Sequence, residues 1–80
     1  MMKPENSKKL EEIFRIVLEI PDGESVAGLR RVAVRRWDSL VHTSLVAAVE
    51  SEFGLRLDAK AIDRFTSYAA VEGVLEELGY

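Results

Sequence analysis

The feature that most constrains the fold is the spacing of apolar residues, which recur every three or four positions in three stretches of the chain. This spacing places them on one face of an α-helix. In the first stretch they are Leu10, Ile13, Phe14, Val17 and Leu18. Asn6 or Ser7 can accept the free amide hydrogens of the first turn, and Pro21 disfavours helical geometry just before it. We therefore predict a helix from about Lys8 to Glu19.

The second stretch predicts a helix over about Ser39 to Phe53, with Asp38 as its N-cap. Gly54 follows the last apolar residue and ends this helix, because glycine readily adopts left-handed geometry. A short segment, Ala59 to Phe65, has few residues to bury and is predicted to form only one or two helical turns.

The third stretch predicts the last helix, which Thr66 or Ser67 caps and Gly79 closes. Its apolar face contains Tyr68, Val71, Val74, Leu75 and Leu78. A cargo could lie in a gap lined by part of this face together with Ile62 and Phe65, but a simple core explains the same pattern.

The segment from Glu24 to Trp37 has no sustained period, and Gly28 argues against a helix there. Its apolar residues, Val26, Leu29, Val32 and Val34, are expected to anchor it to the core. A strand over Arg31 to Arg35 is the competing interpretation, but it has no partner strand. We predict an all-α bundle of four helices, three longer and one short, with a long loop between the first two.

Composition excludes several classes of protein. Eighty residues form a single domain, spanning residues 1–80, that is too small for a deep catalytic cleft. The absence of cysteine excludes disulfides, a thiol nucleophile and cysteine-type metal sites, and a single histidine leaves too few ligands for a metal cage. The sequence contains neither the roughly 18 apolar residues of a membrane span nor the apolar stretch of a secretory signal. We expect a monomeric cytoplasmic protein.

Only one feature of the sequence favours nucleic-acid binding, a short basic segment formed by Arg30, Arg31, Arg35 and Arg36. The formal net charge of the chain is −3, and the predicted helices carry glutamates where a recognition helix needs basic and polar residues. A nucleic-acid partner is therefore not expected.

An enzyme would require a catalytic group, and the only cluster that suggests one is Asp38, Ser39 and His42. In a catalytic triad the carboxylate orients the far nitrogen of the histidine, whereas Asp38 stands beside the serine. No oxyanion hole or substrate pocket is evident. We predict a solvent-facing histidine on a helix and no catalytic activity.

Ser39 stands at a position of particular interest. If Asp38 caps the helix, Ser39 occupies the first turn with its hydroxyl free, at the positive end of the helix dipole. A phosphate attached to this hydroxyl would be stabilised by about 0.3–1 kcal/mol and could meet Arg35 or Arg36. The alternative is that Ser39 only helps to cap the helix.

The stretch WDSLVHTSLVAAVESEFGLRL, with Glu50 and Phe53-Gly54 behind Asp38-Ser39-Leu40, resembles the acyl carrier protein family, which includes peptidyl carrier domains. The resemblance covers nearly the whole chain. It implies that a phosphopantetheinyl transferase moves 4′-phosphopantetheine from coenzyme A to Ser39, with Asp38 and Leu40 as the cofactor-binding residues on either side of it. Acyl or aminoacyl groups, supplied by a ligase or transferase, would then travel as thioesters on the terminal sulfur of this arm.

The chain departs from fatty-acid carriers, which usually have a glycine and acidic residues before the motif and an acidic helix after it. We therefore expect a specialised carrier whose partner enzymes dock beside Asp38, Ser39 and Leu40. The expected docking residues are Arg35, Arg36, Trp37, Val41, His42 and Leu45. Trp37 has a second interpretation, as a core residue under the loop. The alternative function is an unmodified protein interaction module with a carrier-like fold.

Overall fold

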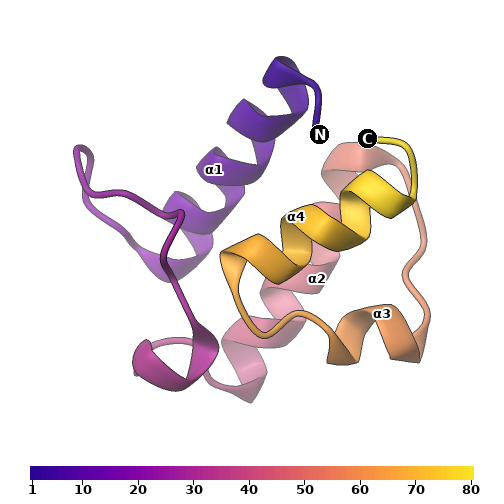
Figure 1. Ribbon diagram of the computed structural model, residues 1–80. Helices are drawn as coiled ribbons and strands as arrows, with labels where there is room; N and C mark the ends of the chain where they lie inside the picture. The colour runs from indigo at the N-terminus through magenta and orange to yellow at the C-terminus, as the bar shows by residue number, and fades with distance from the viewer.

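The computed structural model describes all 80 residues and contains no strand. Its helices are α1 (Pro4–Leu18), α2 (Ser39–Phe53), α3 (Ala59–Asp63) and α4 (Tyr68–Glu77), and a 3-10 turn, η1, spans Arg31–Ala33. The prediction of an all-α bundle with three longer helices, one short helix and a long first loop is confirmed. In Figure 1, α4 crosses in front of α2, α1 lies to one side, and α3 lies below α4. No helix reaches the length and hydrophobicity that crossing a membrane requires.

The start of α1 differs from the prediction. The helix begins at Pro4 rather than near Lys8, and its N-cap, Lys3, makes no side-chain capping bond. Proline suits the first helical position because it has no N–H to satisfy and its φ angle is already helical. The predicted cap residue Asn6 instead donates from its side-chain nitrogen to the carbonyl of Tyr80 at 2.9 Å.

The other helix ends follow local capping rules. Gly54 ends α2 with a φ of 63°, and the Ser67 side chain accepts the N–H of Ala70 at 3.0 Å at the start of α4. Asp58 caps α3 by accepting the N–H of Ala61 at 2.8 Å, which was not predicted. α3 ends at Asp63, earlier than predicted, and Phe65 beyond it is fully buried.

The core lies where α1, α2, α4 and the long loop meet. Phe14 of α1 is fully buried, and its ring lies 5.6 Å from that of Trp37 and 4.9 Å from that of Tyr68, both edge to face. Such edge-to-face aromatic pairs add about 0.5–1.5 kcal/mol beyond their buried area. Phe14 therefore joins three segments that are distant in the sequence.

The long loop is anchored, as predicted, because Val26 and Trp37 are buried. Two backbone bonds attach it to the start of α4: the Arg31 N–H donates to the Thr66 carbonyl at 2.9 Å, and the Tyr68 N–H donates to the Leu29 carbonyl at 3.0 Å. The strand alternative is excluded, since this contact is a single isolated bridge. Val32 was predicted to help anchor the loop but is 87% exposed, because η1 turns it outward.

Candidate functional site

The site forms at the start of α2, and a side chain fixes that start. Asp38 has an extended backbone, and its Oδ1 accepts the N–H of Val41 at 2.9 Å. The Asp38 carbonyl accepts the N–H of His42 at 2.8 Å, which closes the first turn. Asp38 is thus the N-cap, as predicted, and Ser39 is the first residue of the helix.

The Ser39 hydroxyl is exposed and makes no hydrogen bond within the protein. The backbone N–H groups of Ser39 and Leu40 have no acceptor either, because they belong to the first helical turn and the Asp38 carboxylate is bonded to Val41. Three free donors and the positive end of the dipole therefore face solvent at one point. The capping role considered for Ser39 is filled by Asp38 instead.

The four arginines before the site are not equivalent. Arg36 forms an ion pair with Glu19, the C-cap of α1, and the Arg31 Nε donates to the Trp37 carbonyl at 3.4 Å. Arg30 and Arg35 are exposed and have no ion-pair partner. Of the two arginines expected to meet a phosphate on Ser39, Arg35 is the one whose charge is not already paired.

His42 is not solvent-facing, so that prediction is wrong. It is half-buried, its Nδ1 accepts the indole N–H of Trp37 at 3.0 Å, and its Nε2 lies 3.3 Å from the carbonyl of Ile62. Because an indole nitrogen is only a donor, Nδ1 carries no hydrogen and Nε2 donates to Ile62. The histidine therefore connects the end of the long loop to the end of α3.

The charge state of His42 follows from these surroundings. Burial, and then the nearby Arg31 guanidinium, lower the pKa of His42 below its ordinary value of 6.5. The Ile62 carbonyl and the carboxylate of Asp63 oppose this shift. The neutral ring that the two hydrogen bonds require is thus the favoured form near neutral pH.

The catalytic cluster considered from the sequence does not assemble. Both ring nitrogens of His42 bond elsewhere, to Trp37 and Ile62, and the Ser39 hydroxyl bonds to neither His42 nor Asp38. Nothing in this geometry activates the serine as a nucleophile.

Two residues predicted to dock partners are buried. Trp37 is 2% exposed and Leu45 is fully buried, so neither side chain is available to a partner, and Trp37 has the core role that was its second interpretation. Val41 is half-buried, whereas Leu40 is 78% exposed beside Ser39. Sequence periodicity missed the partners of His42, since they lie five residues before it and twenty after it.

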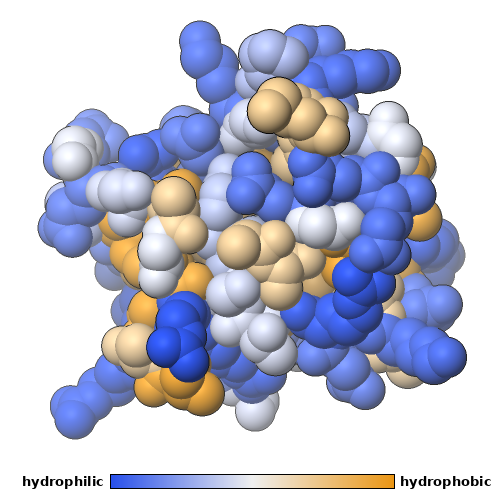
Figure 2. All heavy atoms as spheres, in the orientation of Figure 1, coloured by the Kyte–Doolittle hydropathy of each residue, from blue (hydrophilic) through white to orange (hydrophobic).

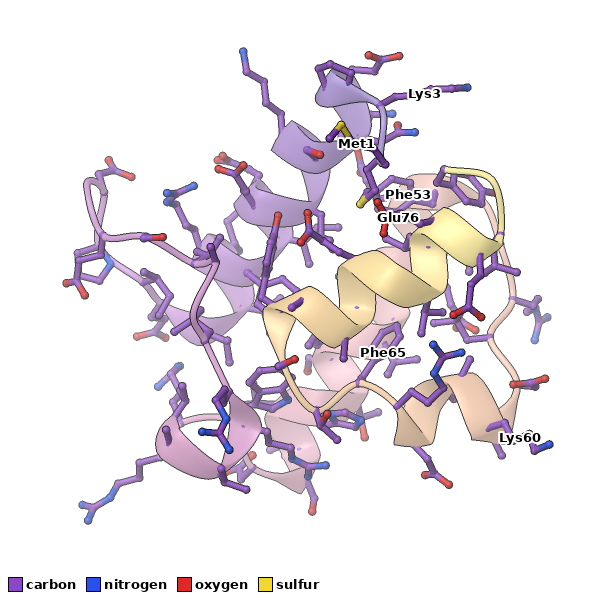
Figure 3. The ribbon with its side chains drawn as sticks, viewed as in Figure 1. Met1, Lys3, Phe53, Lys60, Phe65 and Glu76 are labelled. Atoms are coloured by element: carbon purple, nitrogen blue, oxygen red, sulfur yellow. The ribbon has the colours of Figure 1, made fainter.

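Of the residues considered for a cargo gap, Phe65 and those of α4 belong to the core, and Ile62 is half-buried against it. Phe65, Tyr68, Val71 and Leu75 are all buried, and Figure 3 shows the Phe65 ring beneath α4, inside the bundle. A cavity of about 600 Å³ lies between α3 and α4, lined in part by Ala61, Val74 and Leu78. No group of acidic and histidine side chains is arranged to hold a metal ion.

Replacing Asp38 by alanine is expected to lower the free energy of unfolding by about 0.5–2 kcal/mol, because it leaves the Val41 N–H without its acceptor. Urea denaturation followed by circular dichroism measures the change. Asp22→Ala is the control, since Asp22 is an exposed turn residue that bonds to nothing. Equal stability of the two variants would contradict the capping role.

The comparisons with known proteins give one distant relative. No family model matches the chain, and no solved structure matches it significantly. The chloroplastic acyl carrier protein 1 of Casuarina glauca is 28% identical over 76 residues. The match covers 95% of this chain and 56% of the relative, so the chain spans about half the length of that protein. The chain is thus similar, at low identity, to an acyl carrier protein over nearly its whole length.

Proposed function

We propose that this chain is a carrier protein that receives 4′-phosphopantetheine on Ser39 and carries acyl or aminoacyl groups in a specialised pathway of the cytoplasm. The observation that carries the proposal is the exposed, unbonded Ser39 hydroxyl at the start of α2. The distant homology to an acyl carrier protein supports the same reading.

The residues around Ser39 fit a phosphate diester at its oxygen. The unpaired N–H groups of Ser39 and Leu40 and the free charge of Arg35 are suitable donors for phosphate oxygens. The helix dipole contributes about 0.3–1 kcal/mol for a negative charge in this position. The carboxylate of Asp38, next to Ser39, accepts the N–H of Val41 through its Oδ1 in the cap.

The chain itself would perform no covalent chemistry. In the transfer, the Ser39 oxygen forms a bond to phosphorus, the pyrophosphate bond of coenzyme A breaks, and the nucleotide half leaves, with the serine proton taken by the transferase. When bound, the arm supplies the terminal thiol that the chain lacks, since it has no cysteine. This protein presents the serine, orients it and holds the phosphate.

A dedicated pathway is proposed because the surface near Ser39 is not acidic. The exposed residues that follow it in the first turns of α2 include Leu40, Thr43, Ser44 and Ala47, none of them charged. The first acidic residue of α2, Glu50, accepts the N–H of Leu57 at 2.8 Å. Enzymes whose docking faces are basic would therefore find few carboxylates beside this serine.

Incubation with coenzyme A and a broad-specificity phosphopantetheinyl transferase, followed by intact-mass measurement, tests the proposal. We expect a single mass increase equal to one phosphopantetheine group in the wild-type chain and complete loss of that increase in Ser39→Ala. Ser44→Ala is the matched control, since Ser44 is an exposed serine of the same helix, and it should be modified normally. If no transferase in a panel changes the wild-type mass, the unmodified interaction module becomes the better function.

A further inference from the structure

Four exposed side chains on both sides of Trp37 form what we name the basic–apolar patch: Arg30, Val32, Arg35 and Leu40. Val32 is 87% exposed and Leu40 78% exposed, although full burial of an aliphatic side chain is worth about 1.5–3 kcal/mol. Single exposed aliphatic residues are ordinary, but Val32 lines a groove together with the unpaired Arg30, and Leu40 directly follows Ser39 in the sequence.

The patch is held by a fixed backbone. The 3-10 turn that carries Val32 is bonded through the Arg31 side chain to the Trp37 carbonyl, two residues before Ser39. The Trp37 N–H in turn donates to the Val34 carbonyl at 3.0 Å, and the buried Trp37 side chain anchors this segment in the core. Figure 2 shows hydrophobic spheres beside strongly hydrophilic ones at the lower left, where η1 lies in Figure 1.

A groove continues the patch toward α4. It has a volume of about 380 Å³ and lies between the long loop and the start of α4, with Leu29, Arg30, Val32 and Thr66 among its lining residues. The backbone bonds between Arg31 and Thr66 and between Tyr68 and Leu29 fix its two sides. A partner thus meets a preformed surface and loses little free energy in ordering it.

The charge of the patch is opposite to that of the chain. Residues 30–40 contain four arginines and one acidic residue, Asp38, whereas the chain as a whole has a formal net charge of −3. Arg36 and Arg31 are engaged with Glu19 and with the Trp37 carbonyl, which leaves Arg30 and Arg35 free for a partner. Two free cations beside aliphatic side chains suit a protein surface better than a nucleic-acid backbone, which rewards many phosphate contacts.

We propose that the basic–apolar patch is the docking surface for the transferase that modifies Ser39, and that this transferase presents carboxylates beside a shallow apolar recess. The cations steer the transferase to the start of α2, and Val32 and Leu40 fill the recess. The inference rests on the proposed function, because it requires that Ser39 is modified.

The test measures kcat and KM for Ser39 modification with the transferase that modifies the wild-type chain fastest in a panel. Reversing both free cations in Arg30→Glu/Arg35→Glu is expected to lower kcat/KM by about tenfold, mainly through KM, because two attractive pairs become repulsive. Arg30→Glu alone should give part of the loss in kcat/KM. Because Arg30 is not proposed to contact the phosphate, a loss in this variant reports on docking rather than on a contact between Arg35 and the phosphate. Val32→Ser/Leu40→Ser should also raise KM, and the wild-type kcat/KM should fall as salt is added.

Lys8→Glu/Lys9→Glu is the matched control, since it changes the net charge equally at two exposed lysines of α1 and should leave kcat/KM near the wild-type value. Circular dichroism checks that every variant is folded. Unchanged or faster modification of Arg30→Glu/Arg35→Glu relative to this control overturns the inference. So does binding of a DNA duplex that the same reversal abolishes while kcat/KM stays constant. A wild-type chain that no transferase modifies contradicts the proposed function instead, so the two failures are distinguishable.

Discussion

Replacing Phe14 by alanine is expected to remove about 3–5 kcal/mol of stability, the usual cost of deleting a fully buried phenylalanine. The ring contacts the rings of Trp37 and Tyr68, so its loss leaves a cavity between α1, the long loop and α4. A single hydrophobic core in a domain of about 80 residues rarely supplies more than about 3–5 kcal/mol of stability, and this chain buries 17 residues in its core. The variant should therefore be partly or wholly unfolded at room temperature.

Urea denaturation followed by far-ultraviolet circular dichroism measures this loss. Ile16→Ala is the matched control, because Ile16 belongs to the same helix but is 69% exposed. It should change the free energy of unfolding by less than about 0.5 kcal/mol, as surface substitutions usually do. A loss below about 1 kcal/mol for Phe14→Ala would show that this ring does not join the three segments.

Replacing His42 by alanine is expected to cost about 1–3 kcal/mol, because it leaves the indole N–H of buried Trp37 and the Ile62 carbonyl without their partner. The variant should also loosen α3 from α2, since this bond joins the two helices. Urea denaturation measures the stability, and hydrogen exchange of the α3 amides measures the loosening. Thr43→Ala is the control, because the exposed Thr43 hydroxyl bonds only to the Ser39 carbonyl of its own helix. If His42→Ala is no less stable than this control, the two hydrogen bonds of His42, to Trp37 and Ile62, do not stabilise the fold.

The same histidine predicts a pH dependence. Its pKa is lowered in the folded chain, so the unfolded chain binds the proton more readily. Stability is therefore complete above the ordinary value of 6.5 and is lost as the pH falls from there through the folded-state pKa. The difference in unfolding free energy between wild type and His42→Gln, measured at several pH values, isolates this contribution from that of the carboxylates. If the difference in unfolding free energy between the two proteins stays constant as the pH falls below 6.5, His42 is not held neutral by its bonds to Trp37 and Ile62.

The elements that the sequence predicts well are those whose causes are local. The boundaries of α2 follow from Asp38 and Gly54, which act on adjacent backbone, and the exposure of the Ser39 hydroxyl follows from the same cap. The start of α1 was missed because Pro4 and a contact between Asn6 and Tyr80 extend the helix, and the latter joins opposite ends of the chain. Periodicity carries no information on such a contact.

At the site, too, the sequence predicts only the features that depend on adjacent residues. The position of Ser39 depends on the adjacent cap that Asp38 makes with Val41, but the role of His42 depends on a loop and on α3, which only the folded chain brings together. Trp37 and Leu45 were expected to face partners but are buried, whereas Val32 was expected to anchor the loop but is exposed on the 3-10 turn. The apolar character of a residue does not by itself show whether its side chain is buried in the core or exposed on the surface.

The two ends of the chain lie side by side in Figure 1, and the Lys3 N–H donates to the Tyr80 carbonyl at 3.1 Å. Phe53, at the far end of α2 from Ser39, packs against Tyr80 with ring centroids 5.5 Å apart. Since α2 has 15 residues and is about 22 Å long, Ser39 stands roughly that far from both ends. A fluorescent domain or a solid support attached at either end would thus leave the serine facing open solution, and a short linker would suffice to circularise the chain.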